Sequence, residues 1–474
     1  MAEPDKIHKD PSRLHNWWSR NWFYTALIAI AVIGAFFAFY VPLFFIPEPF
    51  SAGDNVAALR QAILAATGGV LAMLTLWETR RKNLQEKDKN DLDHARQVKA
   101  ERRSRYAKAI EQLADDKSAV RLGGIYTLVK LADEWLTDSK TTPDETDRMA
   151  EGQIIINSLC SYIQSPYSLA EKRIFIEDTE TFEESGDKFT NERAALYTEQ
   201  RIRQLIFNEI SKRSSKCNDS DEIKSGKWSI FEFNFTRSPI FYSLNDINLE
   251  NANFSNSIFY GIANFRGSTF YGSTNFTGAS FEEDAYFSNA TFRGRADFTE
   301  AFFKKYTDFI NVTFIEDALF DSTVFDSNIF QVNHASFHGA KFHGNTSFYK
   351  SVFNAQIHFN KATFHKGVNF DNSCFEESPE FVNEKNIKES DSAGFSYKAK
   401  PNDYSFRIDH SYPGAFDTIQ IDAPDGIAFR IPEGCILFDP DSWDEENQKY
   451  TIKIKPTPIN MQYIIFYKMN TTFP

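Results

Sequence analysis

Phenylalanine recurs with a fixed spacing through the middle of this chain. From Phe254 to Phe325 it returns in steps that alternate between five and six residues, and the same alternation runs from Phe337 to Phe381. Two successive steps together make one full period of the pattern. A period held over so many units indicates a repeat architecture, in which each unit packs on its neighbours, and it outweighs local helix or strand propensity.

The residues around each Phe predict the shape of one unit. The residue two positions earlier is usually small, as at Ala263, Ala285 and Ala296, and the residue between the two is mostly polar or β-branched. Alternate side chains of a strand point to opposite faces, so the small residue and the Phe point inward together. Gly, Ser, Asn or Lys follows, as a turn requires. Each unit is therefore expected to form one side of a coil.

This segment resembles the pentapeptide-repeat proteins, and the stretches ANFRGSTFYGSTNFTGASF and ADFTEAFF carry the resemblance. The resemblance implies a right-handed, four-sided β-helix. The chain departs from the commoner Leu-centred form by using Phe and by adding a sixth residue on alternate sides. Four sides then make one coil, so residues two full periods apart should stack. The stacked charges expected from this register are Glu282 with Lys304, Glu283 with Lys305, Lys304 with Asp326, and Arg295 with Asp317.

The alternation breaks once, in DSNIFQVNHAS between Phe325 and Phe337, where the spacing exceeds one full period by a single residue. One extra residue predicts a bulge or an outward loop. Such a break is either a harmless insertion or a binding feature.

Two uncharged runs near the N-terminus predict a transmembrane hairpin. Residues 21–47 contain no Asp, Glu, Lys or Arg, and 61–77 form a second such run of about 25 Å of helix, at the short end of what spans a bilayer. Trp residues mark their ends, as interfacial aromatics do. The first run is alternatively a cleaved signal peptide, although no small-residue cleavage site precedes Pro47. The second is alternatively a buried core helix.

The charges that flank these runs predict the orientation. Lys6, Lys9, Arg13 and Arg20 precede the first run, Arg60 alone lies between the runs, and a basic segment follows the second. By the positive-inside rule both termini are cytoplasmic.

Residues 78–228 are predicted to be helical. From Arg80 to Lys108 there are eleven basic and five acidic residues and few apolar ones, which is typical of a solvated stalk and would also allow contact with anionic lipid. Apolar residues then recur at helical spacing up to Trp135, with a break at Asp115–Lys117 that Ser118 could cap. Residues 154–163 and 196–210 predict further amphipathic helices.

After Phe381, short alternating runs predict a small β domain that caps the β-helix or acts as a recognition head.

No motif for catalysis, nucleotide binding or metal binding occurs in the chain. His343 and His365 are two periods apart and should stack, but two imidazoles make a weak metal site, so a solvated ladder is expected. Four scattered cysteines with no CxxC pair favour a reduced compartment. We therefore expect no catalytic residue, no cofactor and no metal.

Charge argues against nucleic acid as a direct ligand. The net charge is −13, and residues 229–381 carry more acidic than basic residues. Phosphate-backbone binding needs a basic excess instead.

The wider chain, over residues 20–381, resembles bacterial membrane-anchored pentapeptide-repeat proteins. In these a two-helix anchor leads into a helical segment like AIEQLADDKSAVRLGGIYTLVKLADEW and then into the repeats. The resemblance implies a two-pass protein of the bacterial inner membrane and no reaction.

The expected fold class is mixed: a two-helix transmembrane hairpin, a cytoplasmic α-helical segment, a right-handed quadrilateral β-helix and a small C-terminal β domain. The predicted parts are 1–20 (tail), 21–47 and 61–77 (spans), 48–60 (external loop), 78–228 (stalk and helices), 229–381 (β-helix) and 382–474 (β-rich C-terminal domain).

These features favour a non-enzymatic scaffold whose rigid β-helix or C-terminal domain binds a protein partner. One alternative is a membrane effector of a defence or toxicity system whose hairpin oligomerises, for which Gly68 and Gly69 would allow close helix packing. A second alternative is an acidic DNA mimic that binds a DNA-handling enzyme such as gyrase. The modest acidity and the membrane tether fit the mimic poorly.

Overall fold

The computed structural model describes residues 11–45, 56–177, 186–217, 222–326, 335–354, 356–382, 392–447 and 449–455. Several expectations lie outside these residues: the first part of the N-terminal tail, most of the external loop, the interruption at 327–334 and the last predicted strand, MQYIIFYK. The chain divides into two compact units, Met1–Lys99 and Ala100–Pro474.

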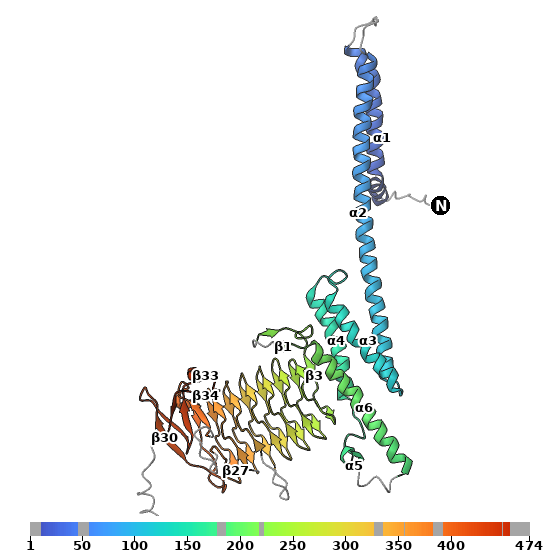
Figure 1. Ribbon diagram of the computed structural model, residues 1–474. Helices are drawn as coiled ribbons and strands as arrows, with labels where there is room; N and C mark the ends of the chain where they lie inside the picture. The colour runs from blue at the N-terminus through green and yellow to red at the C-terminus, as the bar shows by residue number, and fades with distance from the viewer. Residues whose placement is uncertain are drawn as a thin grey trace, which may run out of the picture. The chain divides into compact units, whose positions relative to one another are not determined.

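The first unit is a pair of long helices that lie side by side, α1 (Pro11–Phe45) and the greater part of α2 (Val56–Leu113) (Figure 1). Both are long and apolar enough to cross a membrane, with a mean hydropathy of 2.5 over Trp22–Phe44. The helices approach each other closely at Gly34, where a Cβ atom would come within 2.3 Å of the Thr67 side chain. The neighbouring Gly68 and Gly69 face open space instead.

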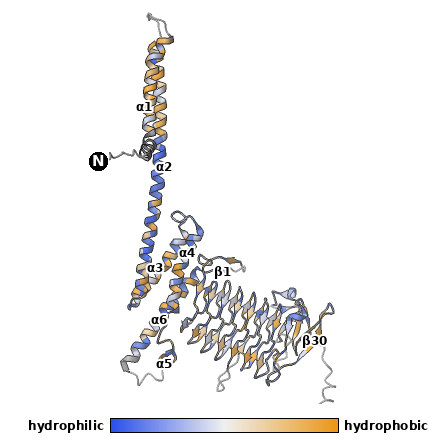
Figure 2. Ribbon diagram, turned by 180° about the vertical axis from the view of Figure 1, so that it is seen from behind, coloured by the Kyte–Doolittle hydropathy of each residue, from blue (hydrophilic) through white to orange (hydrophobic). Residues whose placement is uncertain are grey.

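The second apolar run and the stalk belong to one continuous helix. Figure 2 shows α2 changing from mainly hydrophobic residues beside α1 to hydrophilic residues further along the chain. Exposed ion pairs such as Arg96 with Asp93, at 3.4 Å, lie on the hydrophilic part. This is the pattern expected of a solvated helix.

The second unit begins with a helical bundle. The end of α2 packs with α3 (Ser118–Thr137) and α4 (Glu145–Gln164), and α5 (Arg173–Glu177) and α6 (Gly186–Arg213) follow. The predicted break after Leu113 is confirmed, but Ser118 is not its cap. Lys117 holds the N-cap position without a side-chain cap, and its backbone N–H donates to Asp115 at 2.7 Å. The predicted helices at 154–163 and 196–210 lie within α4 and α6.

A long run of two-residue parallel strands follows the helices and forms a β-helix with four long sheets (Figure 1). We name each sheet by its end strands. The β3–β29 sheet contains β3 (Phe233–Asn234), β6 (Ala252–Asn253), β10 (Thr274–Asn275), β14 (Ala296–Asp297), β18 (Ala318–Leu319), β22 (Thr346–Ser347), β26 (Val368–Asn369) and β29 (Tyr404–Ser405). The β4–β27 sheet contains β4 (Pro239–Ile240), β7 (Ile258–Phe259), β11 (Ser280–Phe281), β15 (Phe302–Phe303), β19 (Val324–Phe325), β23 (Val352–Phe353) and β27 (Cys374–Phe375).

The other two sheets close the coil. The β8–β24 sheet contains β8 (Ala263–Asn264), β12 (Ala285–Tyr286), β16 (Thr307–Asp308), β20 (Ala335–Ser336) and β24 (Ile357–His358). The β5–β35 sheet contains β5 (Asn248–Leu249), β9 (Thr269–Phe270), β13 (Thr291–Phe292), β17 (Thr313–Phe314), β21 (Lys341–Phe342), β25 (Thr363–Phe364), β28 (Gly394–Ser396), β32 (Ile436–Phe438) and, antiparallel, β35 (Lys453–Ile454).

The register of these strands confirms the predicted coil length in the central coils. Ala296 pairs with Thr274 and with Ala318, each two full periods away. The Phe side chains and the small residues before them fill the interior, where both are fully buried. Successive Phe rings stack face to face, as Phe298 does on Phe276 and Phe320 at 4.9 and 5.0 Å. The aromatic core is thus a set of ring columns along the coil axis.

The interruption changes the register by more than the sequence predicted. Across it, paired residues are six positions further apart than in the central coils, as in Thr307 with Ala335 and Val324 with Val352. The segment from Phe325 to Phe337 therefore forms one side of the coil, which elsewhere takes six residues, and does not form two sides. The coil carries six extra residues where one was predicted. The expectation failed because the step from Phe325 to Phe337 was compared with one full period of two sides, whereas the core column passes from Phe309 directly to Phe337, so this step spans a single side.

In the described part of 382–474 short strands are present, and several of them continue the sheets of the β-helix. β28 and β29 add strands to two of the sheets, and β32 pairs with β28. The hairpin of β30 (Thr418–Asp422) and β31 (Ala428–Pro432) and the pair β33 (Trp443–Asp444) and β34 (Lys449–Tyr450) lie at this end of the stack (Figure 1). Phe429 and Ile431 are fully buried. These strands cover the last coil, as the capping interpretation expects.

The corners of the coil place non-glycine residues in the left-handed region. Glu300 has φ 58° and Lys361 has φ 62°, at the position where other coils have Asn or Gly. A side chain other than Gly or Asn is strained there. We expect Glu300→Gly to raise the free energy of unfolding by about 0.5–1 kcal/mol. Thr299→Gly, one residue earlier and outside the left-handed region, should lower it. Chemical denaturation of both variants tests this, and a loss of stability in Glu300→Gly would contradict it.

Candidate interaction surface

The four long sheets differ in the side chains that point outward just before each Phe or Leu of the core. The β3–β29 sheet presents polar residues there, Leu319 excepted: Asn253, Asn275, Asp297, Leu319, Ser347 and Asn369. The β8–β24 sheet presents Asn264, Tyr286, Asp308, Ser336 and His358. The β5–β35 sheet presents Thr269, Thr291, Thr313, Lys341 and Thr363. Three of the faces are thus predominantly polar.

The β4–β27 sheet presents an apolar row. Its outward residues stack in register and are Ile258, Ser280, Phe302, Val324, Val352 and Cys374. All six are partly exposed. At the usual strand spacing the row is about 24 Å long. We call it the apolar row. A row of aligned apolar side chains on a rod whose other faces are mainly polar is the kind of surface that binds another macromolecule.

A charged row runs beside the apolar row, one residue after each Phe. Lys304 contacts Glu282 at 2.5 Å, and Lys305 contacts Glu283. Burial acts to raise the pKa of Glu282, but hydrogen bonds from Lys304 and Ser280 outweigh it and hold that pKa below its usual range. These two stacked pairs are confirmed.

A third predicted pair is not formed. Arg295 donates to Asp297 in its own coil at 2.8 Å, and Asp317 accepts from the backbone and side chain of Asn345. The backbones of Arg295 and Asp317 lie in adjacent coils as predicted, so only the choice of side-chain partner was wrong. Asp326 accepts a hydrogen bond from the side-chain amide of Asn354 at 3.3 Å.

Other segments cover the two ends of the apolar row. At the first coil, Tyr260 donates to Glu171 at 3.4 Å, and the Arg173 guanidinium occupies the space in front of Gly261. At the last coil, Tyr412 forms a side-chain hydrogen bond with Cys374. The middle of the row, from Ser280 to Val352, stays accessible over four coils.

The two histidines predicted to stack do so, with ring centroids 4.2 Å apart. His365 also lies against Phe438, and its Nε2 is 2.9 Å from the Tyr450 hydroxyl. Burial, with His343 and Lys341 nearby, lowers the pKa of His365 to about 3. The ladder is thus covered by the C-terminal strands, whereas a solvated ladder was expected. Among the described residues, no group of three or more His, Cys, Asp or Glu side chains is arranged to hold a metal ion.

The lowered pKa of His365 predicts a loss of stability in mild acid. The folded chain keeps this imidazole neutral while the unfolded chain protonates it below about pH 6.5, so stability falls as the pH drops through that value. We expect about 1 kcal/mol to be lost between about pH 7.5 and about pH 5.5. Thermal melts of His365→Gln should show a smaller pH dependence than the wild type. His410→Gln, at an exposed site, should match the wild type. Equal pH dependence in His365→Gln would contradict the prediction.

The sequence reasoning did not identify the apolar row. The sequence does contain the pattern: in each coil, the residue before one particular Phe is usually apolar. Recognising this pattern requires knowing which units belong to the same sheet. The six extra residues after Phe325 shift the pairing by six positions in the coils that follow, so the sequence alone did not give it.

Comparison with known families gave one match. The family model described as Pentapeptide repeats (9 copies) matches residues 254–301 and 331–373. Comparison with curated proteins gave no match, and comparison with solved structures gave none either. The matched segments coincide with the parallel strands whose Phe and small residues fill the coil. The chain therefore carries pentapeptide repeats, preceded by a helical region.

Proposed function

We propose that this protein is a non-enzymatic, membrane-anchored scaffold in which a right-handed quadrilateral rod presents the apolar row to a protein partner. The apolar row itself carries the proposal, because among the described residues it is the one face of the four on which the outward residues, Ser280 excepted, are apolar over several coils. Pentapeptide-repeat proteins are often interaction scaffolds, which supports the same assignment.

The construction of the rod suits docking. Each coil is held to the next by backbone hydrogen bonds and by stacked rings, so the exposed side chains occupy fixed positions. A preorganised surface loses little conformational entropy when a partner binds. Apolar area in the middle of such a surface contributes affinity, and the adjacent charged row with Lys304 and Glu282 contributes selectivity.

The anchor is proposed to be the helix pair α1 and α2 in a bacterial inner membrane, with both termini in the cytoplasm. Their length and hydropathy support it. The basic residues at both ends of the pair, against Arg60 alone between the runs, support the orientation. Anionic lipid near the basic part of α2 would add to the anchoring.

A membrane-impermeant maleimide tests the orientation in intact cells. Exposed Cys217 should react only after permeabilisation if the rod is cytoplasmic. Ser51→Cys, in the predicted external loop, should react in intact cells. Labelling of Cys217 in intact cells would refute the orientation.

The docking surface is tested by a matched pair of double variants. Val324 and Val352 are register neighbours on the apolar row, and Thr291 and Thr313 are register neighbours on the β5–β35 face. All four are partly exposed. Full-length protein purified in mild detergent should retain a stoichiometric protein partner in the wild type and in T291K/T313K, and lose it in V324K/V352K. Retention in V324K/V352K would exclude this face, and a homo-oligomer with nothing else attached would favour the membrane effector.

A further inference from the structure

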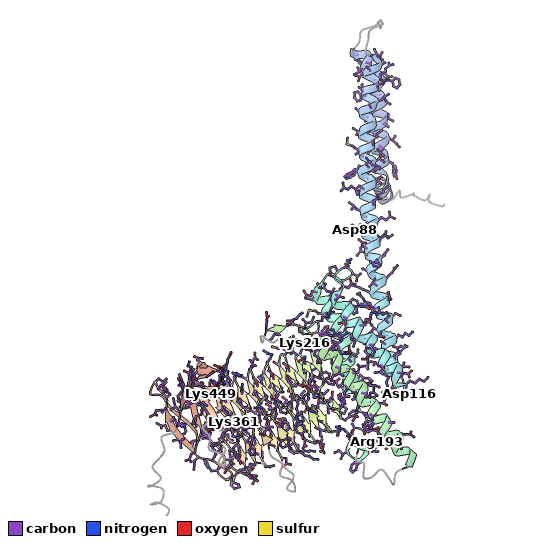
Figure 3. The ribbon with its side chains drawn as sticks, in the orientation of Figure 1. Asp88, Asp116, Arg193, Lys216, Lys361 and Lys449 are labelled. Carbon is purple, nitrogen blue, oxygen red and sulfur yellow. The ribbon has the colours of Figure 1, made fainter. Side chains whose placement is uncertain are left out.

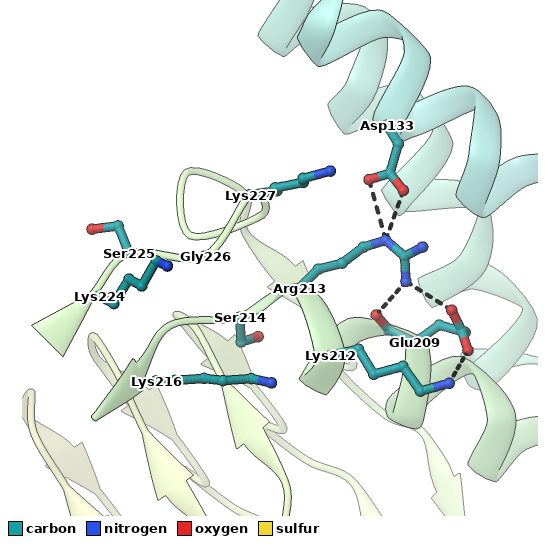
Figure 4. A pocket seen from close by; sticks show the side chains of 10 residues that line it. All are labelled: Asp133, Glu209, Lys212, Arg213, Ser214, Lys216, Lys224, Ser225, Gly226 and Lys227. Carbon is teal, nitrogen blue, oxygen red and sulfur yellow. Dashed lines mark hydrogen bonds and ion pairs between the residues drawn. The ribbon is translucent and has the colours of Figure 1, made fainter. Parts of the chain in front are cut away.

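A basic pocket lies where the helical bundle meets the start of the β-helix. It has a volume of about 460 Å³ and is formed by the end of α6, by α3 and by the hairpin of β1 (Lys216–Cys217) and β2 (Ile223–Lys224) (Figure 4). All of its walls belong to the second compact unit. Nothing in the proposed docking function uses it.

Arg213 lines the pocket and is held there by contacts with two acidic residues, Asp133 and Glu209. Its Nε donates to both carboxylate oxygens of Asp133 at 2.9 and 3.1 Å, and its Nη1 donates to Glu209 at 2.7 Å. The guanidinium lies 5.0 Å from the centroid of the Trp228 ring, whose Nε1 also donates to Asp133. Lys212 contacts Glu209 at 2.5 Å. The two carboxylates of the pocket are thus neutralised by Arg213 and Lys212.

Three further lysines surround the same space. Lys216 and Lys224 come from the hairpin and Lys227 from the loop after it (Figure 4). Lys216 is also labelled in the view of the whole chain (Figure 3). All three are exposed, and no ion pair joins any of them to another described residue. The pocket lining therefore contains five basic side chains against two acidic ones. Lys212 and Arg213 complement the negative end of α6, but the three further lysines lie beyond that helix.

The loop that carries Lys227 is held in place by backbone contacts. A Cβ at Gly226 would come within 2.1 Å of the Arg213 carbonyl oxygen, so the loop lies directly on the end of α6. The Trp228 N–H donates to that carbonyl at 3.0 Å, and the Gly226 N–H donates to the Ser215 hydroxyl. The backbone that carries Lys227 is therefore fixed against the end of α6.

We propose that this pocket binds a small ligand that carries a pyrophosphate group. Three ammonium groups around one space repel one another, and an anion between them removes that repulsion. Lysine binds phosphate as a point charge, and these three charges, which form no ion pair with a described residue, match a pyrophosphate group at neutral pH. The volume is in the range of small-molecule pockets. The site would let the scaffold respond to a soluble metabolite as well as to a partner protein.

Isothermal titration of the full-length protein in detergent with inorganic pyrophosphate tests the proposal. K224Q/K227Q removes two of the three lysines, both at exposed positions where folding is unaffected. We expect its dissociation constant to rise by about tenfold or more, since each lost contact is to a charged group. K130Q/K366Q removes two exposed lysines elsewhere and should bind as the wild type does.

Three results would overturn the proposal. They are no saturable binding of pyrophosphate by the wild type, equal binding by K224Q/K227Q, and equal binding of sulfate and pyrophosphate, which would indicate a non-specific charge effect. Because neither double variant touches the apolar row, loss of pyrophosphate binding and loss of the protein partner are separate outcomes.

Discussion

Replacing Phe309 with Ala is expected to lower the free energy of unfolding by about 3–5 kcal/mol. This side chain is fully buried in the middle of the β-helix. Its ring stacks on Phe287 and Phe337 at 4.7 Å on either side, nearly parallel to both. It also meets Phe298 and Phe320 edge to face at 5.5 and 5.6 Å. Replacing Phe309 therefore removes at least four close ring contacts at once.

The expected loss has two sources. Removing the ring forfeits the free energy of transferring it from water, about 1.5–3 kcal/mol. It also leaves a cavity that cannot close, because the coils above and below are held apart by the backbone ladder, as in the hydrogen bond from the Phe309 N–H to the Ser336 carbonyl at 2.7 Å. A side chain of the same volume would be needed to restore the packing.

Urea denaturation of the full-length protein in detergent measures this loss. Thr313→Ala is the matched control, since Thr313 belongs to the next side of the same coil but points outward and is partly exposed. It should change stability by less than about 0.5 kcal/mol. A loss below about 1 kcal/mol in Phe309→Ala would show that the ring columns are not the main source of stability.

Much of the β-helix was predictable because its period is encoded at every unit. The inward Phe and the small residue before it, as at Phe298 and Ala296, are physical requirements of a narrow coil, and both are buried as predicted. The stacked pair of Lys304 and Glu282 followed from the length of the coil alone. Such features depend only on the local residue pattern and on the number of residues in one coil.

Other features depend on contacts that the period does not encode. The six extra residues after Phe325 were undercounted because the step from Phe325 to Phe337 was close to one full period, and the sequence does not show that this step spans only one side of the coil. The strands after Phe381 join the β-helix through irregular separations, such as that between the paired residues Val368 and Tyr404. The basic pocket brings Asp133 and Arg213 together from two helices far apart in the chain. No repeat or motif in the sequence marks that pairing.

Arg203→Ala should also cost about 3–5 kcal/mol, for a different reason. Arg203 is almost fully buried between the helices and the first coils. It contacts Glu199 at 2.8 Å and donates to the backbone carbonyls of Ile163 and Ser165 at 2.8 and 2.9 Å. Its guanidinium also lies 5.3 Å from the centroid of the Phe241 ring. One side chain thus joins α6, the end of α4 and the β-helix.

Removing Arg203 leaves buried groups without their donors. Glu199 would keep the contact with Arg121 at 2.7 Å and the hydrogen bond from Tyr162, but the carbonyls of Ile163 and Ser165 would lose theirs. An unsatisfied buried polar group costs about 1–3 kcal/mol, and an incompletely paired charge costs more. The cost should therefore far exceed that of deleting an exposed partner.

A comparison of variants separates this effect from loss of charge alone. Arg103→Ala is the control, because Arg103 is 70% exposed and pairs with Glu151 at 3.2 Å on the surface, where a pair contributes less than about 1 kcal/mol. E199Q/R203M removes both charges of the buried pair while keeping similar volume, and should recover part of the loss seen in Arg203→Ala. If Arg203→Ala costs no more than Arg103→Ala in urea denaturation, the buried network does not hold the helices to the β-helix. If E199Q/R203M is less stable than Arg203→Ala, the contacts of Glu199 with Arg121 and Tyr162 outweigh the cost of its buried charge.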